Sequence, residues 1–258
     1  MEVCVLASGS KGNSIYVSGG GVSLLVDAGL SARELVARMR LADIEPESIQ
    51  ALLITHDHED HYRGVDVFGR KHGTRLFANE GTASGIEARY PKFSCEWEIF
   101  ETASTFEIGG LRVEAFTVPH DAADPVGFVF DDGASRLCVT TDLGQATSLV
   151  RAKLAGCNVA VLESNHDYEM LMKSERPMSL KTRIAGRSGH LSNDDAAELM
   201  RDVVPPQMHT LLLAHLSDEC NTPYLALDTM TRTLRKAGRA DVRVEVMSQT
   251  QVSARFTV

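Results

Sequence analysis

Short apolar runs rich in Val, Ile and Leu recur along the chain and are separated by longer amphipathic stretches. Runs of this length predict strands, whereas apolar positions at helical spacing predict helices. We expect strands at 3–7, 14–17, 22–26, 51–55, 75–78, 111–118, 127–130, 137–141, 159–162, 210–214 and 243–247. We expect helices at 31–44, 146–154, 193–203 and 222–237. Grouped strands with helices between them predict an α/β fold of layered sheets flanked by helices.

Two of these helices carry recognisable start signals. Ser31 and Glu34 have the spacing of a capping box at the start of the first helix. Before the third helix, Ser192 or Asn193 can accept the first free amide protons. A flexible GRSG turn just before that start presents His190.

Composition and charge narrow the class of protein. The 258 residues are 43% hydrophobic and 24% charged, as in soluble globular proteins, and no apolar run is long enough to cross a bilayer. The start of the chain lacks the basic segment of a signal peptide. Five cysteines without a C-x-x-C pair indicate free thiols, so we expect a cytoplasmic protein. A net charge of −9 argues against coating nucleic acid by charge alone, but allows an enzyme that grips a polyanion with bound metal and one basic segment.

The densest chemistry lies in the segment THDHEDH, residues 55–61, which directly follows a predicted apolar strand. His56 and His58 point the same way on an extended segment, and Asp60 and His61 lie on the turn beyond. Imidazoles and carboxylates at this density are costly to bury unless a neutral or cationic partner organises them, although polar loop residues sometimes cluster without one. One loop can therefore supply two adjacent metal ions with nitrogen and oxygen ligands.

Further candidate ligands follow later strands. His120, Asp142 and His215 each stand at the end of an apolar run. One polar residue at a strand end is commonly structural, but several strand ends that each deliver a metal ligand indicate a common site. Two metal ions about 3.5–4 Å apart can share a water, lower its pKa and stabilise attacking and leaving oxygens.

This set of residues resembles, in order and context, the ligand set of the metallo-β-lactamase superfamily. The resemblance implies a single hydrolase domain over residues 1–258, folded as a four-layer αββα sandwich with two divalent ions, Zn or Mn, at one edge. It implies that His56, His58 and His120 hold one ion, that Asp60, His61 and His215 hold the other, and that Asp142 bridges them. Asp60 would also orient or deprotonate the shared water, and Asp27 would brace the ligands from behind.

Two features favour phosphodiesters among the substrates of this superfamily, a Glu–His pair and a basic run. The pair comes first. Glu163 follows an apolar strand, and the GHLSNDDAA segment begins with His190. Both resemble the Glu–His pair with which phosphodiesterase members protonate the leaving oxygen. A carboxylate that holds one imidazole nitrogen raises the pKa of the ring and equips it as a general acid. A capped helix beside an ordinary salt link is the structural alternative.

The second feature is a basic run in this acidic chain. Five cations and one acid lie between residues 170 and 190, which indicates either a solvated surface or a phosphate-binding flap. We take Lys181, Arg183 and Arg187 as candidate substrate contacts, together with Ser10 and Asn13 of the SGSKGNS turn. His166 faces the cleft or caps the next helix. His72 is expected at the surface.

The ASGSKGNS start, with LESNHD and GHLSN, resembles most closely the bacterial YycJ-like (WalJ-like) branch of DNA exonucleases. The expected function is a dinuclear-metal phosphodiesterase that hydrolyses DNA, as a 5′→3′ exonuclease. A hydrolase of a small ester, thioester or phosphodiester is one alternative. A catalytically silent metal-binding regulator is another, which the complete ligand set disfavours. A homo-oligomer and repair-pathway protein partners remain open, and no membrane partner is expected.

Overall fold

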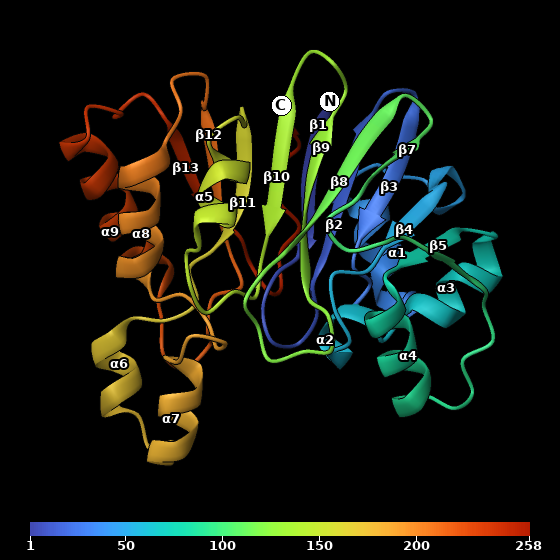
Figure 1. Cartoon of the computed structure of the whole chain (residues 1–258), viewed down its shortest axis with the longest axis horizontal. Coiled ribbons are helices and arrows are strands. Elements are labelled where there is room, and N and C mark those ends of the chain that lie inside the picture. Colours follow the sequence, from blue (N-terminus) through green and yellow to red (C-terminus); the bar gives the residue numbers. More distant parts are fainter.

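Two seven-stranded sheets pack face to face in the computed structural model, which describes residues 1–258 (Figure 1). The first sheet has the order β14-β1-β2-β3-β4-β5-β6, with strands at Phe256–Thr257, Glu2–Ala7, Ser14–Gly19, Val22–Val26, Ala51–Leu53, Arg75–Ala78 and Trp97–Ile99. The second has the order β13-β12-β11-β10-β9-β8-β7, at Arg243–Val246, Thr210–Ala214, Val159–Glu163, Arg136–Thr140, Val126–Asp131, Leu111–Thr117 and Thr105–Ile108.

Helices cover the outer faces of both sheets (Figure 1). Beside the first sheet lie α1, α2, α3 and α4, at Ala32–Leu41, Glu59–Tyr62, Val65–His72 and Glu80–Arg89, with a short 3-10 turn at Pro46–Ser48. Beside the second lie α5, α8 and α9, at Ser148–Leu154, Asn193–Val203 and Pro223–Lys236. The hairpin of α6 (Tyr168–Lys173) and α7 (Met178–Ile184) projects below them. No helix is both long and apolar enough to span a lipid bilayer.

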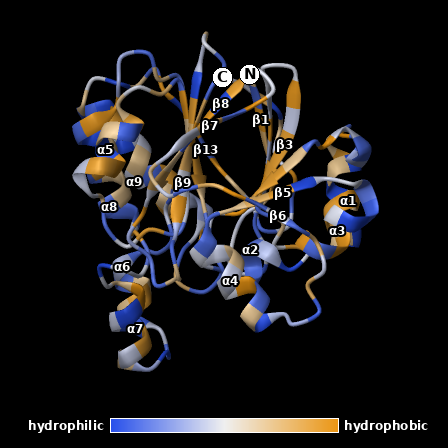
Figure 2. Ribbon diagram, turned by 45° about the vertical axis from the view of Figure 1, so that its right-hand side comes forward, coloured by the Kyte–Doolittle hydropathy of each residue, from blue (hydrophilic) through white to orange (hydrophobic).

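Three apolar layers hold this sandwich together. The central layer lies between the sheets, and the outer two lie between each sheet and its helices. In β10, Leu137 and Val139 face the other sheet, whereas Cys138 between them faces the helices. A strand buried on both faces reads as a continuous apolar run, which is the pattern seen in the sequence. Figure 2 shows these hydrophobic strands between helices with hydrophilic outer surfaces. The predicted αββα sandwich is therefore confirmed.

The two sheets have related topologies that bring strand ends to one edge. In each, an antiparallel half leads into a parallel half: β3, β4, β5 and β6 are parallel in the first sheet, and β10, β11, β12 and β13 in the second. The carboxyl ends of neighbouring parallel strands meet at the same edge. That edge lies opposite the chain termini in Figure 1.

Each predicted strand and helix is present, with local corrections. The strand expected at 51–55 ends at Leu53; the Ile54 amide still donates to the Phe77 carbonyl of β5 (2.9 Å), but the Thr55 amide turns to Asp27 Oδ1 (2.9 Å). Ser192, rather than Asn193, caps α8, with its Oγ accepting from the Asp195 amide at 3.0 Å.

Two further expectations need revision. Ser31 caps α1 as predicted, but the Glu34 carboxylate pairs with Arg38 (2.9 Å), so the reciprocal bond of a capping box is absent. The expectation that His72 lies at the surface was wrong. Its side chain is 4% exposed, packs against Phe68 and contacts Glu47 at 3.3 Å.

Candidate active site

Three candidate site residues adopt the left-handed backbone conformation just after a strand. Asp27, Asp142 and His215 follow β3, β10 and β12 and have φ of +62°, +55° and +56°. Only two other non-glycine residues of the chain, Asp43 and Ala103, have positive φ. Such conformations cost on the order of 1–3 kcal/mol each and persist where the surrounding structure imposes them. Three of the five strained non-glycine residues of this fold are therefore candidate site residues.

The loop after β4 is pressed against the turn that follows β3. A Cβ atom on Gly29 would lie 1.5 Å from the Asp60 carbonyl oxygen, so only glycine permits this approach. The Asp60 carbonyl accepts from the Asn13 amide at 2.8 Å. Thr55 Oγ1 lies 2.9 Å from Asp27 Oδ2 and 3.0 Å from His56 Nδ1. The loop is therefore fixed by the Thr55 side chain at one end and by the Asp60 backbone at the other.

One cluster of potential ligand atoms comes from His56, His58 and His120, which lie within 4.8 Å of one another. The Nδ1 atom of His120 donates to the Gly189 carbonyl at 3.0 Å, which turns its Nε2 toward His58 Nδ1 at 3.3 Å. This arrangement places one ring nitrogen of each of the three imidazoles within reach of a single ion.

A second cluster comes from Asp60, His61 and His215. His61 Nδ1 lies 2.8 Å from Asp27 Oδ2, so its Nε2 faces the cluster. Asp60 Oδ2 lies 3.6 Å from His61 Nε2 and 3.7 Å from His215 Nε2. The Asp142 carboxylate stands between the clusters, 3.3 Å from His61 Nε2, 3.4 Å from His215 Nε2 and 4.0 Å from His120 Nε2.

These residues fit a divalent metal ion. His56 Nε2, His215 Nε2 and Asp142 Oδ2 are buried and have no hydrogen-bond partner. Buried polar atoms are almost always paired, so three unpaired atoms among these neighbouring ligands indicate a partner that the protein itself does not supply. Imidazole nitrogens with carboxylate oxygens suit borderline ions such as Zn or Mn. The site therefore supports the use of divalent metal.

The electrostatics of the ligand set agree with this interpretation. Burial and the neighbouring His61 and His120 hold the pKa of His56 well below its ordinary value, so its ring is neutral and able to bind a cation. Burial would raise the pKa of Asp60, but His61 and His215 lower it below its ordinary value. Burial also opposes charge on His61, yet Asp142, Asp27 and Asp60 raise its pKa to about 9. A bound metal ion would supply the positive charge that these carboxylates otherwise draw from a protonated His61 ring.

Glu163 is fully buried and joins the metal ligands to His190. Its Oε1 accepts from His190 Nδ1 at 2.7 Å and lies 3.1 Å from His215 Nδ1. Its Oε2 accepts from the Leu143 and Leu191 amides, both at 3.0 Å. Burial lowers the pKa of His190, but the Glu163 carboxylate outweighs that effect and raises it. The bond through Nδ1 leaves Nε2 of the ring free to donate a proton.

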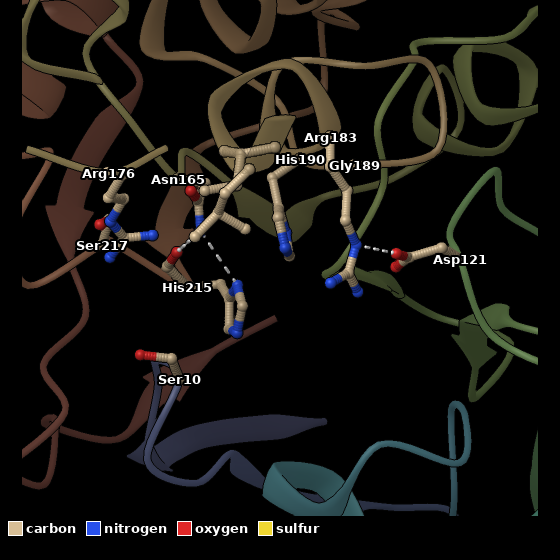
Figure 3. A pocket seen from close by; sticks show the side chains of 11 residues that line it. Ser10, Asp121, Asn165, Arg176, Arg183, Gly189, His190, His215 and Ser217 are labelled. Carbon is tan, nitrogen blue, oxygen red and sulfur yellow. Dashed lines mark hydrogen bonds and ion pairs between the residues drawn. The ribbon is translucent and has the colours of Figure 1, made fainter. Parts of the chain in front are cut away.

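A pocket of about 190 Å³ opens beside His190 and His215 (Figure 3). Ser10 lines it at the bottom of the view, Asn165 lies above His215, and α7 supplies Arg183 from its last turn. The lining also includes Asp121, Arg176, Leu180, Ile184, Gly189 and Ser217. Two of the residues proposed from sequence to bind substrate, Ser10 and Arg183, thus lie on this pocket.

Other proposed substrate contacts lie elsewhere. Lys181 is buried, and its ammonium donates to the Met172 carbonyl at 2.6 Å. Arg187 donates to Gln145 Oε1 at 2.9 Å and does not line the pocket. Asn13 is buried, with its Nδ2 3.0 Å from His61 Nε2, so it lies directly against the second ligand cluster and not on the pocket.

His166 does not cap the next helix, because Asp167 does so by accepting from the Met170 amide at 2.8 Å. The His166 ring is buried instead, with an unpaired Nδ1. Two residues that were not among the candidate substrate contacts also belong to the site. Asn165 donates to the His215 carbonyl at 2.8 Å, and Arg176, one of the five cations of the basic run, lines the pocket.

Comparison with known proteins agrees with the fold. Residues 23–215 match the family described as the beta-lactamase superfamily domain. The metallo-beta-lactamase fold protein YhfI from Bacillus subtilis superposes with a TM-score of 0.74 over 98% of both chains, at 14% identity. The chain belongs to the metallo-β-lactamase superfamily.

Within this superfamily the chain falls in the YycJ-like branch, as its motifs predicted. It is 37% identical over 239 residues to exodeoxyribonuclease YycJ of Bacillus anthracis, covering 92% of this chain and 90% of the relative. It is also 37% identical over 236 residues to exodeoxyribonuclease WalJ of Streptococcus pneumoniae, covering 90% and 88%. The fold, the ligand set and these relatives together define a metal-dependent hydrolase.

Proposed function

We propose that this protein is a dinuclear-metal deoxyribonuclease, acting as a 5′→3′ exonuclease, and that residues 1–258 work as one hydrolase domain. The observation that carries the proposal is the pairing of Glu163 with His190 at 2.7 Å, next to two clusters of metal ligands. Hydrolysis of a thioester has no need of a strong proton donor at this position, whereas the alkoxide that leaves a phosphodiester does. The names of the curated relatives support DNA as the substrate.

Two divalent ions, Zn or Mn, would be held by the two clusters, with Asp142 between them. When bound, such a pair supplies Lewis acidity and lowers the pKa of a water. Ligand sets with these donors do not by themselves select between the two metals.

The chain's own groups then move the protons. The oxygen of a water forms a bond to phosphorus as the bond from phosphorus to the leaving oxygen breaks. Asp60, whose side chain is 25% exposed, orients that water and takes up its proton. His190 donates the proton from Nε2 to the leaving oxygen, and Glu163 stabilises the charged ring beforehand. The products are a phosphomonoester and an alcohol, so one water is consumed per cut.

The test compares substrates under one set of conditions. Protein loaded with manganese or zinc is incubated with double- and single-stranded DNA labelled at either end, beside bis-p-nitrophenyl phosphate and a thioester. We expect a 5′ label to leave first as a mononucleotide and a 3′-labelled strand to shorten progressively. Hydrolysis confined to the thioester or to the small diester would refute a DNA substrate. Metal analysis that finds one ion per active chain would refute the dinuclear part alone.

Because the proposed substrate is DNA, we place the enzyme in the cytoplasm. The five cysteines are free, as a reducing compartment requires.

A further inference from the structure

The pocket beside His190 has a cationic wall that the reaction described above does not use. Arg176 lies between α6 and α7, and Arg183 lies in the last turn of α7. Asp121 is the one carboxylate that lines the same pocket. The pocket is thus basic, although it adjoins a ligand set rich in carboxylates.

Each arginine is held by one nitrogen atom only. Arg183 Nε donates to Asp121 Oδ2 at 2.6 Å, and Arg176 Nε donates to Glu219 Oε2 at 3.0 Å. The terminal nitrogens of both guanidinium groups make no hydrogen bond within the chain. Figure 3 shows the terminal nitrogens of Arg183 pointing the same way as the His190 ring, toward the open centre of the site. Two parallel N–H donors on a planar fork match the oxygens of a phosphate.

The arginines and the candidate general acid belong to one piece of structure. The His190 amide donates to the Ile184 carbonyl at the end of α7, at 2.8 Å. A Cβ on Gly189 would lie 2.2 Å from the carbonyl oxygens of both Arg183 and Ile184, so α7 is packed directly against the residue before His190. A phosphate bound by Arg183 would therefore occupy a fixed position relative to His190.

We infer that this pocket binds the nucleotide on the leaving side of the cut, with its own phosphate held by Arg176 and Arg183. The inference rests on the proposed phosphodiesterase function, because His190 protonates the leaving oxygen and the group beside it is the leaving group. The phosphate takes up the free nitrogens that Asp121 and Glu219 do not engage. Leu180 and Ile184 supply the apolar wall for the sugar. For removal from a 5′ end, the leaving oxygen is the 3′ oxygen of the terminal nucleotide, so the bound phosphate is the 5′ phosphate.

The experiment uses two minimal substrates that differ by this phosphate, pTpT and TpT, with metal-loaded protein. We expect the wild-type protein to cleave pTpT with the higher kcat/KM. In Arg183→Ala and Arg176→Ala we expect the ratio of the two kcat/KM values to fall by about 10-fold each, as for loss of a hydrogen bond to a charged group. Arg201→Ala, on the exposed face of α8, is the matched control and keeps the ratio.

A variant with the opposite effect guards against loss of folding. Glu219→Gln removes the carboxylate that competes for Arg176, and its side chain is 68% exposed. We expect it to lower KM for pTpT. Equal rates on pTpT and TpT in the wild-type protein, or equal slowing of both in the arginine variants, would overturn the inference and leave the proposed function standing. Wild-type protein that cleaves neither dinucleotide nor DNA would refute the proposed function itself.

Discussion

Replacement of Glu163 by Gln tests whether one buried carboxylate orients both a metal ligand and the proton donor. The carboxylate accepts four hydrogen bonds, two from backbone amides on Oε2 and two from imidazoles on Oε1. An amide has one oxygen, so it can serve only one pair. Turning its NH2 toward the Leu143 and Leu191 amides would leave two buried donors unpaired, at about 1–3 kcal/mol each. The amide oxygen therefore stays with the backbone.

The NH2 group of the glutamine then faces His190 and His215. Each ring can accept this bond only if its proton moves from Nδ1 to Nε2. In His215, Nε2 is the buried, unpaired nitrogen that would bind the metal. A proton on Nε2 would therefore have to leave before the metal could bind. Loss of such an orienting partner costs about 10–100-fold in metal affinity. For His190, loss of the carboxylate removes the group that keeps the ring protonated and ready to donate, and turnover falls by about 10²–10⁴-fold.

Two assays separate these effects. Competition against a fluorescent chelator measures metal affinity, and turnover of end-labelled DNA at saturating metal measures the loss of proton transfer. Glu169→Gln, an exposed change on α6, is the matched control. The pH profile supplies a further check, because a general acid is active below its pKa. Since Glu163 raises the pKa of His190 above the ordinary 6.5, wild-type activity falls as pH rises through that raised value, and the falling limb moves to lower pH in the variant. Unchanged affinity and an unchanged profile would refute the assignment.

Three further predictions follow from the same geometry. His190→Ala should keep its metal content but slow DNA hydrolysis by about 10²–10⁴-fold, and should slow bis-p-nitrophenyl phosphate less, because p-nitrophenolate leaves without a proton; equal slowing of both substrates would contradict this role. Gly189→Ala should lower the free energy of unfolding by about 1–3 kcal/mol, measured by urea denaturation, because its Cβ collides with the carbonyls of Arg183 and Ile184; wild-type stability would show that α7 moves freely. Removal of metal with a chelator should abolish hydrolysis and readdition of manganese or zinc should restore it; activity that survives chelation, with metal content below one ion per chain, would exclude a metal-dependent reaction.

The candidate ligands could be predicted from the sequence because each stands in a local pattern. An apolar strand that stops at a polar residue is visible without any tertiary information, as at His215. The same holds for Glu163, the last residue of β11. Parallel strand ends then meet at one edge for topological reasons, so residues far apart in the chain can be assigned to one place.

The pocket could not be predicted in this way, because its residues depend on how a short hairpin packs. Lys181 and Arg183 lie in the same basic run, but residues two apart on a helix point in different directions. In α7 this places the ammonium of Lys181 inside the hairpin, on the Met172 carbonyl, and Arg183 on the pocket. Arg176 lies on the connection before α7, where no periodicity applies. The helix α4 was missed for a related reason, since Gly81 and Gly85 weaken its helical pattern.

The proton donor His190 is held in place by contacts with both ligand clusters. Its fixed position limits which parts of the site can select between substrates. Glu163 joins His190 to His215 of one cluster, and the Gly189 carbonyl accepts from His120 of the other. Moving His190 by a bond length would therefore disturb a ligand on each side. A proton donor fixed in this way cannot adapt to leaving groups of different shape. Discrimination between substrates must then come from what the adjoining pocket admits and holds, which is why its arginines, rather than the ligand set, are the residues that should distinguish this enzyme from other hydrolases of the same fold.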